Sequence, residues 1–381
     1  MNVTRALLVC ITLLLGSGCA TVDRVATSPA EPAQDDQAFR SKSLHIIHAP
    51  PQRATTPEAA AVINADVAEP DEEPAAFWDQ VRDGLRLPDT TQSRVRKRTA
   101  EYGSKPRQVE QIFARGQPYL AYILSEVQKR KFPTEIVLLP YVESGYDPFA
   151  FSYGRAAGMW QFIPATGKMY GLHQDWWYDG RRDVVASTRA ALDYLDYLQN
   201  KFDGDWLLAV AAYNSGSGAV SRAIKKNRSN GRPTDFWHLD LPSETAAYVP
   251  KLLAISNIVR DPQQYDISLD PVDTEQTLTV VETHGQLDIS VAAELADMDT
   301  ESFYLLNPGY NRWTTHPNGP HRLVVPVSRS DTFEENIAVL PDAERTRLHR
   351  HKVRPGETLS HIARQYNTTT RALLSSNQLS G

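Results

Sequence analysis

The sequence predicts a mainly α protein, in which a helical domain is followed by small α+β modules. Between Phe77 and Tyr265, apolar residues recur at spacings of three and four, as on the buried face of a helix. The last third of the chain differs, because two stretches in it share the same order of short elements, which indicates an internal repeat. The 381 residues, 41% hydrophobic and 23% charged, suffice for two or three soluble domains.

The charge balance limits the class of partner. The net charge is −6, and the composition indicates no strongly basic surface. Phosphate backbones are bound by clustered Lys and Arg, so a nucleic acid is not expected as a partner. An uncharged polymer remains possible as a partner.

The first 19 residues have the layout of a secretory signal peptide and are expected to be removed. A basic Arg5 precedes an apolar core, and small residues lead to Cys19. This ending resembles a bacterial lipobox, although Gly16 stands where the box usually has Leu, and the resemblance implies that Cys19 is lipidated. A plain signal peptide cut nearby is the alternative. Ala20 takes the place of the Asp associated with inner-membrane retention, which favours the outer membrane.

Residues 20–76 are expected to form a disordered tether. The segment is rich in Ala, Pro, Glu, Asp and Thr and poor in aromatic residues, so it cannot bury enough apolar area to offset the entropy of ordering. Such an extended, proline-stiffened chain would let an anchored domain reach away from a membrane surface.

A domain at residues 77–270 is predicted to begin with a short amphipathic helix, from Phe77 to before Pro88. A buried helix is expected to start at Pro133, and Glu143 lies near its C-terminal end. A carboxylate there gains nothing from the helix dipole and loses water to apolar neighbours, so its pKa rises. Glu143 is therefore either a general acid for a glycosidic oxygen or a structural residue that caps the helix or pairs with an Arg.

The segment AAGMWQFIPATG, residues 156–167, combines small residues with aromatic residues and an amide. Small residues permit a close backbone approach. Trp160, Gln161 and Phe162 suit a sugar groove, with flat apolar faces for pyranose rings and an amide for hydroxyl or acetamido groups. The alternative is a core, where Trp and Phe beside a proline are more often found.

Two later helices are predicted from capping residues. Asp183 and Asp205 are each expected to begin a helix, and Gly216 and Gly218 to stop the second of them. That end would carry Tyr213–Asn214, a hydroxyl and an amide that could face a ligand.

A further helix is expected after Pro242. Glu244 would lie in its first turn, and Tyr248 follows four residues later on the same face. A carboxylate and a hydroxyl would thus point to the same side.

Four motifs occur in order along the domain: VESGYDP, AAGMWQFIPATG, AAYNSG and ETAAYVPKLLA. Together they resemble the soluble lytic transglycosylase domain of the family 1 murein transglycosylases, over about Phe77 to Tyr265. The resemblance implies a lysozyme-like helical domain that cleaves the β-1,4 bond between N-acetylmuramic acid and N-acetylglucosamine. The product would carry a 1,6-anhydro ring on the muramic acid.

The resemblance also implies roles for single residues. Glu143 falls on the family's single catalytic acid and base. The substrate's own C6 hydroxyl would attack C1, so the second carboxylate of ordinary glycosidases is not needed. Ile163 departs from the methionine found in some members. The positions implied to contact substrate are Ser152, Gln161, Ile163, Thr166, Tyr213, Asn214, Glu244 and Tyr248.

Two other functions stay open. Asp147, Asp175, Asp179 and Asp183 are interpreted as turn and cap residues. One of them facing Glu143 across a cleft, with room for a water, would instead indicate goose-type lysozyme hydrolysis, a muramidase activity. A non-catalytic cell-wall-binding protein is the other alternative, which the presence of Glu143 and the later motifs disfavours.

Two stretches of the last third resemble LysM modules, which bind N-acetylglucosamine polymers. Residues 350–381, with the turn PGETL, lack the closing strand, and their unpaired first strand would leave an open edge. Residues 276–330 show the same order of elements with a long insertion, and are expected either to bind glycan or to pack against the catalytic domain. Residues 331–349 are expected to be a linker.

No cofactor and no metal are expected. The histidines are scattered, and His349 and His351 lie in a basic segment expected to be solvated. The expected partners are peptidoglycan glycan strands and a membrane, reached through the lipid anchor on Cys19. The expected protein is a monomer in the cell envelope, an outer-membrane lipoprotein facing the periplasm.

Overall fold

The structure is a computed structural model of the chain, and it describes residues 43–46, 76–88, 91–274, 277–346, 349–366, 369–377 and 379. The expected signal peptide at 1–19, Cys19 with its lipid, and most of the expected tether lie outside these residues. In the part that is described, no helix is both long and apolar enough to cross a bilayer.

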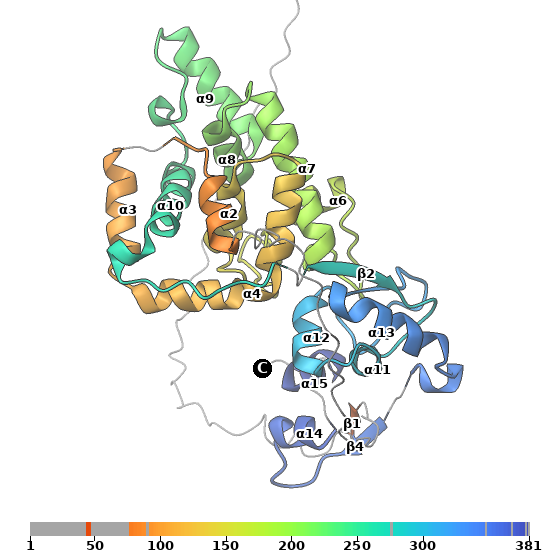
Figure 1. The fold of residues 1–381 in the computed structure, drawn as a ribbon. Helices are drawn as coiled ribbons and strands as arrows, with labels where there is room; N and C mark the ends of the chain where they lie inside the picture. The colour runs from red at the N-terminus through yellow and green to blue at the C-terminus, as the bar shows by residue number, and fades with distance from the viewer. Residues whose placement is uncertain are drawn as a thin grey trace, which may run out of the picture. The chain divides into compact units, whose positions relative to one another are not determined.

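The mainly α fold class is confirmed, because helices make up the first domain. Figure 1 shows α3 and α10 of this domain side by side. The elements are α2 (Phe77–Asp83), α3 (Ser93–Gly103), α4 (Pro106–Lys129), η1 (Thr134–Leu138), α5 (Leu139–Glu143), α6 (Pro164–Met169), α7 (Val184–Lys201), α8 (Trp206–Ser215), α9 (Ser217–Ser229), η2 (Phe236–His238), α10 (Ser243–Arg260) and η3 (Pro262–Tyr265).

The predicted caps of α7 and α8 are confirmed. Asp183 Oδ1 accepts a hydrogen bond from the N–H of Ala186, and Asp205 Oδ1 accepts from the second and third N–H groups of α8. Gly216, with a φ of 79°, ends α8 as expected. The same expectation for Gly218 is wrong, because Gly216 also serves as the N-cap of α9 and the chain is helical again from the next residue.

The buried helix expected before Glu143 is divided into η1 and α5. Pro140 has no N–H, so the α-helical bond to the carbonyl of Ile136 cannot form, and the N–H of Leu139 bonds to that carbonyl instead. The residues of η1 are buried, as expected. Glu143 is the last residue of α5.

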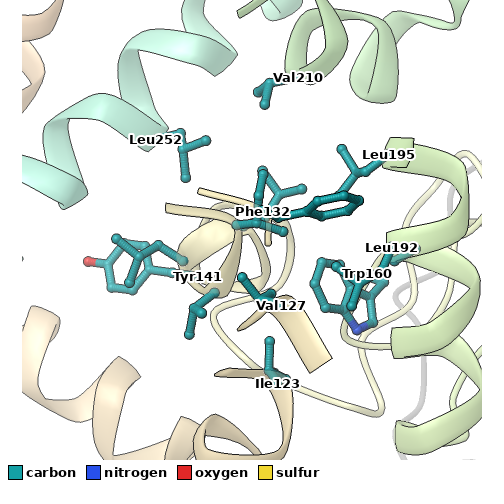
Figure 2. Close-up of a cluster of buried hydrophobic side chains, with 14 of the residues drawn as sticks. Ile123, Val127, Phe132, Tyr141, Trp160, Leu192, Leu195, Val210 and Leu252 are labelled. Carbon is teal, nitrogen blue, oxygen red and sulfur yellow. The ribbon is translucent and has the colours of Figure 1, made fainter. Parts of the chain in front are cut away.

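The helices enclose one apolar core, which fixes the position of α5 and hence of Glu143. Figure 2 shows side chains from α4, α7, α8 and α10 pointing toward one another around this segment. The labelled residues are Ile123, Val127, Phe132, Tyr141, Trp160, Leu192, Leu195, Val210 and Leu252.

The first expected repeat has the predicted order of elements, from β2 (Leu278–Glu282) through α11 (Ile289–Leu295) and α12 (Thr300–Leu306) to β3 (Arg322–Pro326). β2 and β3 pair antiparallel, with Val280 opposite Val324. The long insertion lies between α12 and β3. A separate apolar cluster includes buried residues of both helices and both strands.

A helix occupies part of the range expected as a linker. α13 (Val327–Ala338) follows β3 directly, and η4 (Asp342–Glu344) comes after it. Phe333 and Ile337, four residues apart, are buried in the second apolar cluster. The polar residues between them hid this two-residue face in the sequence.

The second expected repeat also differs from the expectation. Its first strand, β4 (His349–Lys352), pairs antiparallel with β1 (Ser43–Ile46), a strand inside the range expected as tether. α14 (Leu359–Gln365) and α15 (Thr370–Asn377) complete the described part of this repeat. The prediction of an unpaired first strand is therefore wrong, because four residues of the tether range supply its partner.

The first repeat contacts the helical domain, which was one of its two expected roles. The hydroxyl of Tyr119 on α4 donates to the carbonyl of Leu305 on α12 at 3.0 Å. The N–H of Asp179 donates to the carbonyl of Gly309 at 2.8 Å. Both bonds use backbone carbonyls of the repeat, so they depend on its fold more than on its side chains.

Candidate active site

One cavity of about 580 Å³ in the helical domain, called the active-site cavity below, is lined by all nine predicted catalytic and substrate-contacting residues. They come from α5, the loop before α6, α6, α8 and α10. The predicted residues are Glu143, Ser152, Gln161, Ile163, Thr166, Tyr213, Asn214, Glu244 and Tyr248; the others are Val142, Ala156, Phe162, Tyr194, Ser215, Gly216 and Lys251.

Glu143 lies half-buried at the end of α5. The pKa of its carboxyl is raised to about 7, because burial and the nearby charge of Glu244 raise it more than a hydrogen bond from Tyr248 and the charge of Lys251 lower it. The carboxyl of Glu143 therefore keeps its proton to a much higher pH than an exposed glutamate does. The hydrogen-bond partner is a tyrosine and not the arginine of the structural alternative.

Tyr248 joins α10 to the carboxyl of Glu143. Its hydroxyl donates to Oε1 of Glu143. Burial and the charge of Glu143 hold the pKa of Tyr248 well above its usual range, so the hydroxyl stays protonated and remains a donor. Glu244 lies one turn earlier and is exposed, and Lys251 follows three residues later and is half-buried.

The loop before α6 is fixed by its own backbone. Ser152 Oγ accepts from the N–H of Ala156 at 3.0 Å, and the N–H of Ser152 donates to the carbonyl of Ala156 at 2.9 Å. Gln161 Nε2 donates to the carbonyl of Gly158 at 2.8 Å. The amide group of Gln161 therefore offers a ligand mainly its carbonyl oxygen.

Trp160 belongs to the core and not to the cavity. Its side chain is fully buried, and Nε1 donates to Thr188 Oγ1 on α7 at 2.9 Å. Its carbonyl accepts from the hydroxyl of Tyr213 at 2.9 Å. Of the aromatic pair considered for a sugar groove, Phe162 lines the cavity.

Asn214 keeps its amide nitrogen for a ligand. Its Oδ1 accepts from Thr245 Oγ1 at 2.8 Å, which orients the amide group at the end of α8. Within the described residues, the nitrogen makes no hydrogen bond of its own. It can donate to a hydroxyl or an acetamido oxygen in the cavity.

None of the four aspartates considered as a second carboxylate lines the cavity. Asp147 and Asp175 each accept from the N–H two residues later, as turn residues do. Asp179 pairs with Arg181 at 2.7 Å, and Asp183 caps α7. Among the cavity residues, the other carboxylate is that of Glu244, which was predicted as a substrate contact.

Tyr194 and Lys251 are among the cavity residues that were not predicted as site residues. Tyr194 lies on α7, the helix predicted from its cap Asp183, and the centroid of its ring lies 5.5 Å from that of Tyr213. Lys251 shares a helix face with Glu244 and Tyr248, at spacings of seven and three residues, and this periodicity could have revealed it.

No group of three His, Cys, Asp or Glu side chains that could hold a metal occurs among the described residues. His351 is buried and not solvated as expected, because it contacts the hydroxyl of Tyr366 at 2.9 Å and Oε2 of Glu357 at 2.8 Å.

Comparison with known proteins identifies related domains along the chain. The family model of the Transglycosylase SLT domain matches residues 122–236, that of the lytic transglycosylase MltD LysM-like domain matches 277–341, and that of the LysM domain matches 351–381. Membrane-bound lytic murein transglycosylase D of Escherichia coli (strain K12) is 39% identical over 315 residues, which are 80% of this chain and 70% of that protein. The chain belongs to the membrane-bound lytic murein transglycosylase D family. This confirms the expected lytic transglycosylase domain with LysM-like modules.

More distant similarities extend beyond the transglycosylase D family. Membrane-bound lytic murein transglycosylase C of Haemophilus influenzae (strain PittGG) is 28% identical over 143 residues, which are 34% of this chain and 40% of that protein. The crystal structure of an inactive mutant of lytic transglycosylase Slt from Pseudomonas aeruginosa aligns with a TM-score of 0.30 and 24% identity, covering 40% of this chain and 25% of that chain.

Proposed function

We propose that this chain is a peptidoglycan lytic transglycosylase in which Glu143 acts as both acid and base. It cleaves the β-1,4 bond between N-acetylmuramic acid and N-acetylglucosamine and leaves a 1,6-anhydro ring on the muramic acid. The observation that carries the proposal is the Glu143 carboxyl, which lines the active-site cavity with a pKa of about 7 and accepts a hydrogen bond from Tyr248. A carboxyl with that pKa can both give and take a proton near neutrality.

The reaction uses one carboxyl twice. Protonated Glu143 donates its proton to the glycosidic oxygen as the bond from C1 to that oxygen breaks. The resulting carboxylate takes the proton of the C6 hydroxyl of the same muramic acid as its oxygen bonds to C1. The net reaction consumes no water, and the attacking group is already tethered to the reacting ring, which lowers the entropic cost of the attack.

Tyr248 stabilises the carboxylate between the two proton transfers. Its hydroxyl donates to Oε1, which leaves the second carboxyl oxygen of Glu143 to exchange the proton with substrate. Tyr248 thus favours the charged form that burial disfavours, and so limits the rise of the pKa.

The other predicted residues are proposed to hold the glycan strand. Asn214 donates from its amide, and Gln161 accepts at its carbonyl oxygen, while Ser152 and Thr166 offer hydroxyls. Tyr213 supports the loop of Gln161 through its bond to the carbonyl of Trp160. Ile163, 48% exposed, offers an apolar rim. These groups match the hydroxyl, acetamido and ring faces of an uncharged polysaccharide.

The remaining modules and the N-terminus bear on location. The match to LysM families supports binding of peptidoglycan by the C-terminal modules. We propose that lipidated Cys19 anchors the chain to the outer membrane, that it faces the periplasm, and that it acts as a monomer. Palmitate labelling of the full chain tests the anchor, with Cys19→Ala as the control that should lose the label.

Muropeptide mass spectrometry tests the reaction itself. Purified peptidoglycan incubated with the full chain should release muropeptides with anhydro ends, each one water lighter than its hydrolysed counterpart. Hydrated reducing ends would instead establish a muramidase, with Glu244 as the first residue to examine for the activation of water. Release of no product would indicate a wall-binding protein.

The pH dependence should report the Glu143 carboxyl. Because the acid form starts the reaction and its pKa is about 7, kcat/KM should be flat below pH 7 and fall above it, without the acid limb that a second essential carboxylate would add. Tyr248→Phe should move the falling limb to higher pH, since the lost hydrogen bond lowers this pKa, and should reduce kcat about tenfold. Initial rates across pH measure both effects.

Glu244→Gln should shift the pKa of Glu143 in the opposite direction from Tyr248→Phe. The charge of Glu244 raises the pKa of Glu143, so its removal should move the limb to lower pH. A limb that stays in place in both variants would show that another group controls it.

A further inference from the structure

A second, smaller cavity adjoins the active-site cavity. This side pocket, of about 200 Å³, is lined by Glu101, Tyr102, Lys105, Gln108, Val109, Ile112, Tyr141, Val142 and Lys251. Val142 and Lys251 line both cavities, and Val142 is the residue next to Glu143. The side pocket therefore begins at the place where the reacting sugar must lie.

The walls of the side pocket come from four elements. Tyr102 comes from the end of α3, Val109 and Ile112 from α4, Tyr141 from α5, and Lys251 from α10. Apolar and aromatic side chains form one part of the lining, and the amide of Gln108 with the charged groups forms the rest. A mixture of this kind suits a short peptide better than a sugar ring, because it combines small apolar contacts with charge recognition.

The charges in the side pocket are unbalanced. Glu101 pairs with Arg98 at 2.6 Å outside the lining. Lys105 and Lys251 form no ion pair with any carboxylate within the described ranges. Lys251 is half-buried and lines both cavities, and its positive charge lowers the pKa of Glu143. A half-buried ammonium without a paired anion favours an anionic group on whatever enters the pocket.

The substrate of the proposed reaction carries such a group. Each muramic acid bears a lactyl ether, to which a short peptide with free carboxylates is attached. The muramic acid whose C1 reacts lies against Glu143, so its own substituent is the part of the polymer nearest to the mouth of the side pocket. An unsubstituted neighbouring sugar offers only hydroxyls and an acetamido group, and these leave both lysines unpaired.

We propose that the side pocket receives the peptide stem of the muramic acid at the cleaved bond, and that Lys251 pairs with a stem carboxylate and makes the enzyme selective for stem-bearing strands. This inference rests on the proposed function. It adds a specificity-determining residue that acts through substrate binding and not through proton transfer.

The test compares two forms of one glycan. Kinetics of the full chain would be measured on peptide-bearing strands and on the same strands stripped of stems by an amidase, at a pH well below 7, where Glu143 is protonated. The wild type should prefer the peptide-bearing strands. Lys251→Met should lower kcat/KM through KM about tenfold more on these strands than on the stripped strands, as expected for loss of a hydrogen bond to a charged group.

Measurement at low pH separates the loss of substrate binding from any change in the protonation of Glu143. Loss of the Lys251 charge raises the pKa of Glu143, so the carboxyl stays protonated in both proteins under these conditions. Lys251→Arg should keep the preference. Lys97 is an exposed lysine of α3 that lines neither cavity, so Lys97→Met should behave as the wild type.

The outcomes distinguish a failure of the side-pocket assignment from a failure of the proposed function. A wild type without preference, an unchanged preference in Lys251→Met, or an equal loss on both substrates overturns the assignment of the side pocket. Absence of anhydro products from the wild type on either substrate overturns the proposed function instead.

Discussion

Glu143→Gln is expected to lower kcat/KM for the release of anhydro-muropeptides by about 10³- to 10⁴-fold. The amide has nearly the same shape as the carboxyl, but it can neither donate the proton to the leaving oxygen nor take it from the C6 hydroxyl. Product release from purified peptidoglycan, followed by mass spectrometry, measures the loss. Glu244→Gln serves as the comparison, because it removes the other carboxylate of the same cavity and should cost far less.

Stability should change in the opposite direction from activity. The folded-state pKa of Glu143, about 7, is raised above the ordinary value of 4.5, so this group stabilises the fold least above pH 7, where the buried carboxyl is charged. Its contribution is complete below pH 4.5 and is lost as the pH rises through 7. The free energy of unfolding of Glu143→Gln should therefore exceed that of the wild type more at pH 8 than at pH 4. An inactive variant that is also unstable at pH 8 would mean that misfolding caused the loss.

Gly158→Ala should be among the most destabilising single changes in the helical domain. Gly158 has a φ of 80°, and an added Cβ would lie 2.0 Å from the carbonyl oxygen of Arg181. The obstacle is backbone and cannot rotate away, so the loop carrying Ser152 and Gln161 has to move. We expect the free energy of unfolding to fall by about 3–5 kcal/mol, measured by urea denaturation, together with a loss of activity.

Gly171→Ala is the matched control. Gly171 has a similar φ of 76°, but no atom lies within 4 Å of the added Cβ. Its cost should be only the strain of the left-handed backbone, about 1–2 kcal/mol. Equal costs for the two variants would show that the approach of Arg181 to Gly158 is not what requires the glycine.

Local signals in the sequence predicted the parts of the site that depend on a single element. The caps Asp183 and Asp205 are recognisable because a carboxylate bonds to N–H groups within three residues of itself. The face shared by Glu244 and Tyr248 follows from helical periodicity alone. The family motifs then indicated which of these faces meet, which no spacing within one helix can show.

What escaped prediction depends on contacts between distant segments. Whether Trp160 faces the cavity or the core is decided by Thr188 on α7, twenty-eight residues away. The pairing of β1 with β4 joins residues about 300 positions apart in the chain. The place of Lys251 between two cavities depends on the end of α3 as well as on α10. Propensity and periodicity describe neither the partner nor the distance in such cases.

The hydrogen bonds around Trp160 bear on which positions of the cavity tolerate substitution. Its indole is bonded to Thr188 on α7 and its carbonyl to Tyr213 on α8, so three segments share one buried residue behind the cavity. Ile163, on the exposed rim, takes no part in these bonds and is 48% exposed. A substitution on the rim therefore need not disturb the buried junction behind the cavity. Ile163, a proposed substrate contact, is accordingly a position where substitution is expected to leave the fold of the helical domain intact.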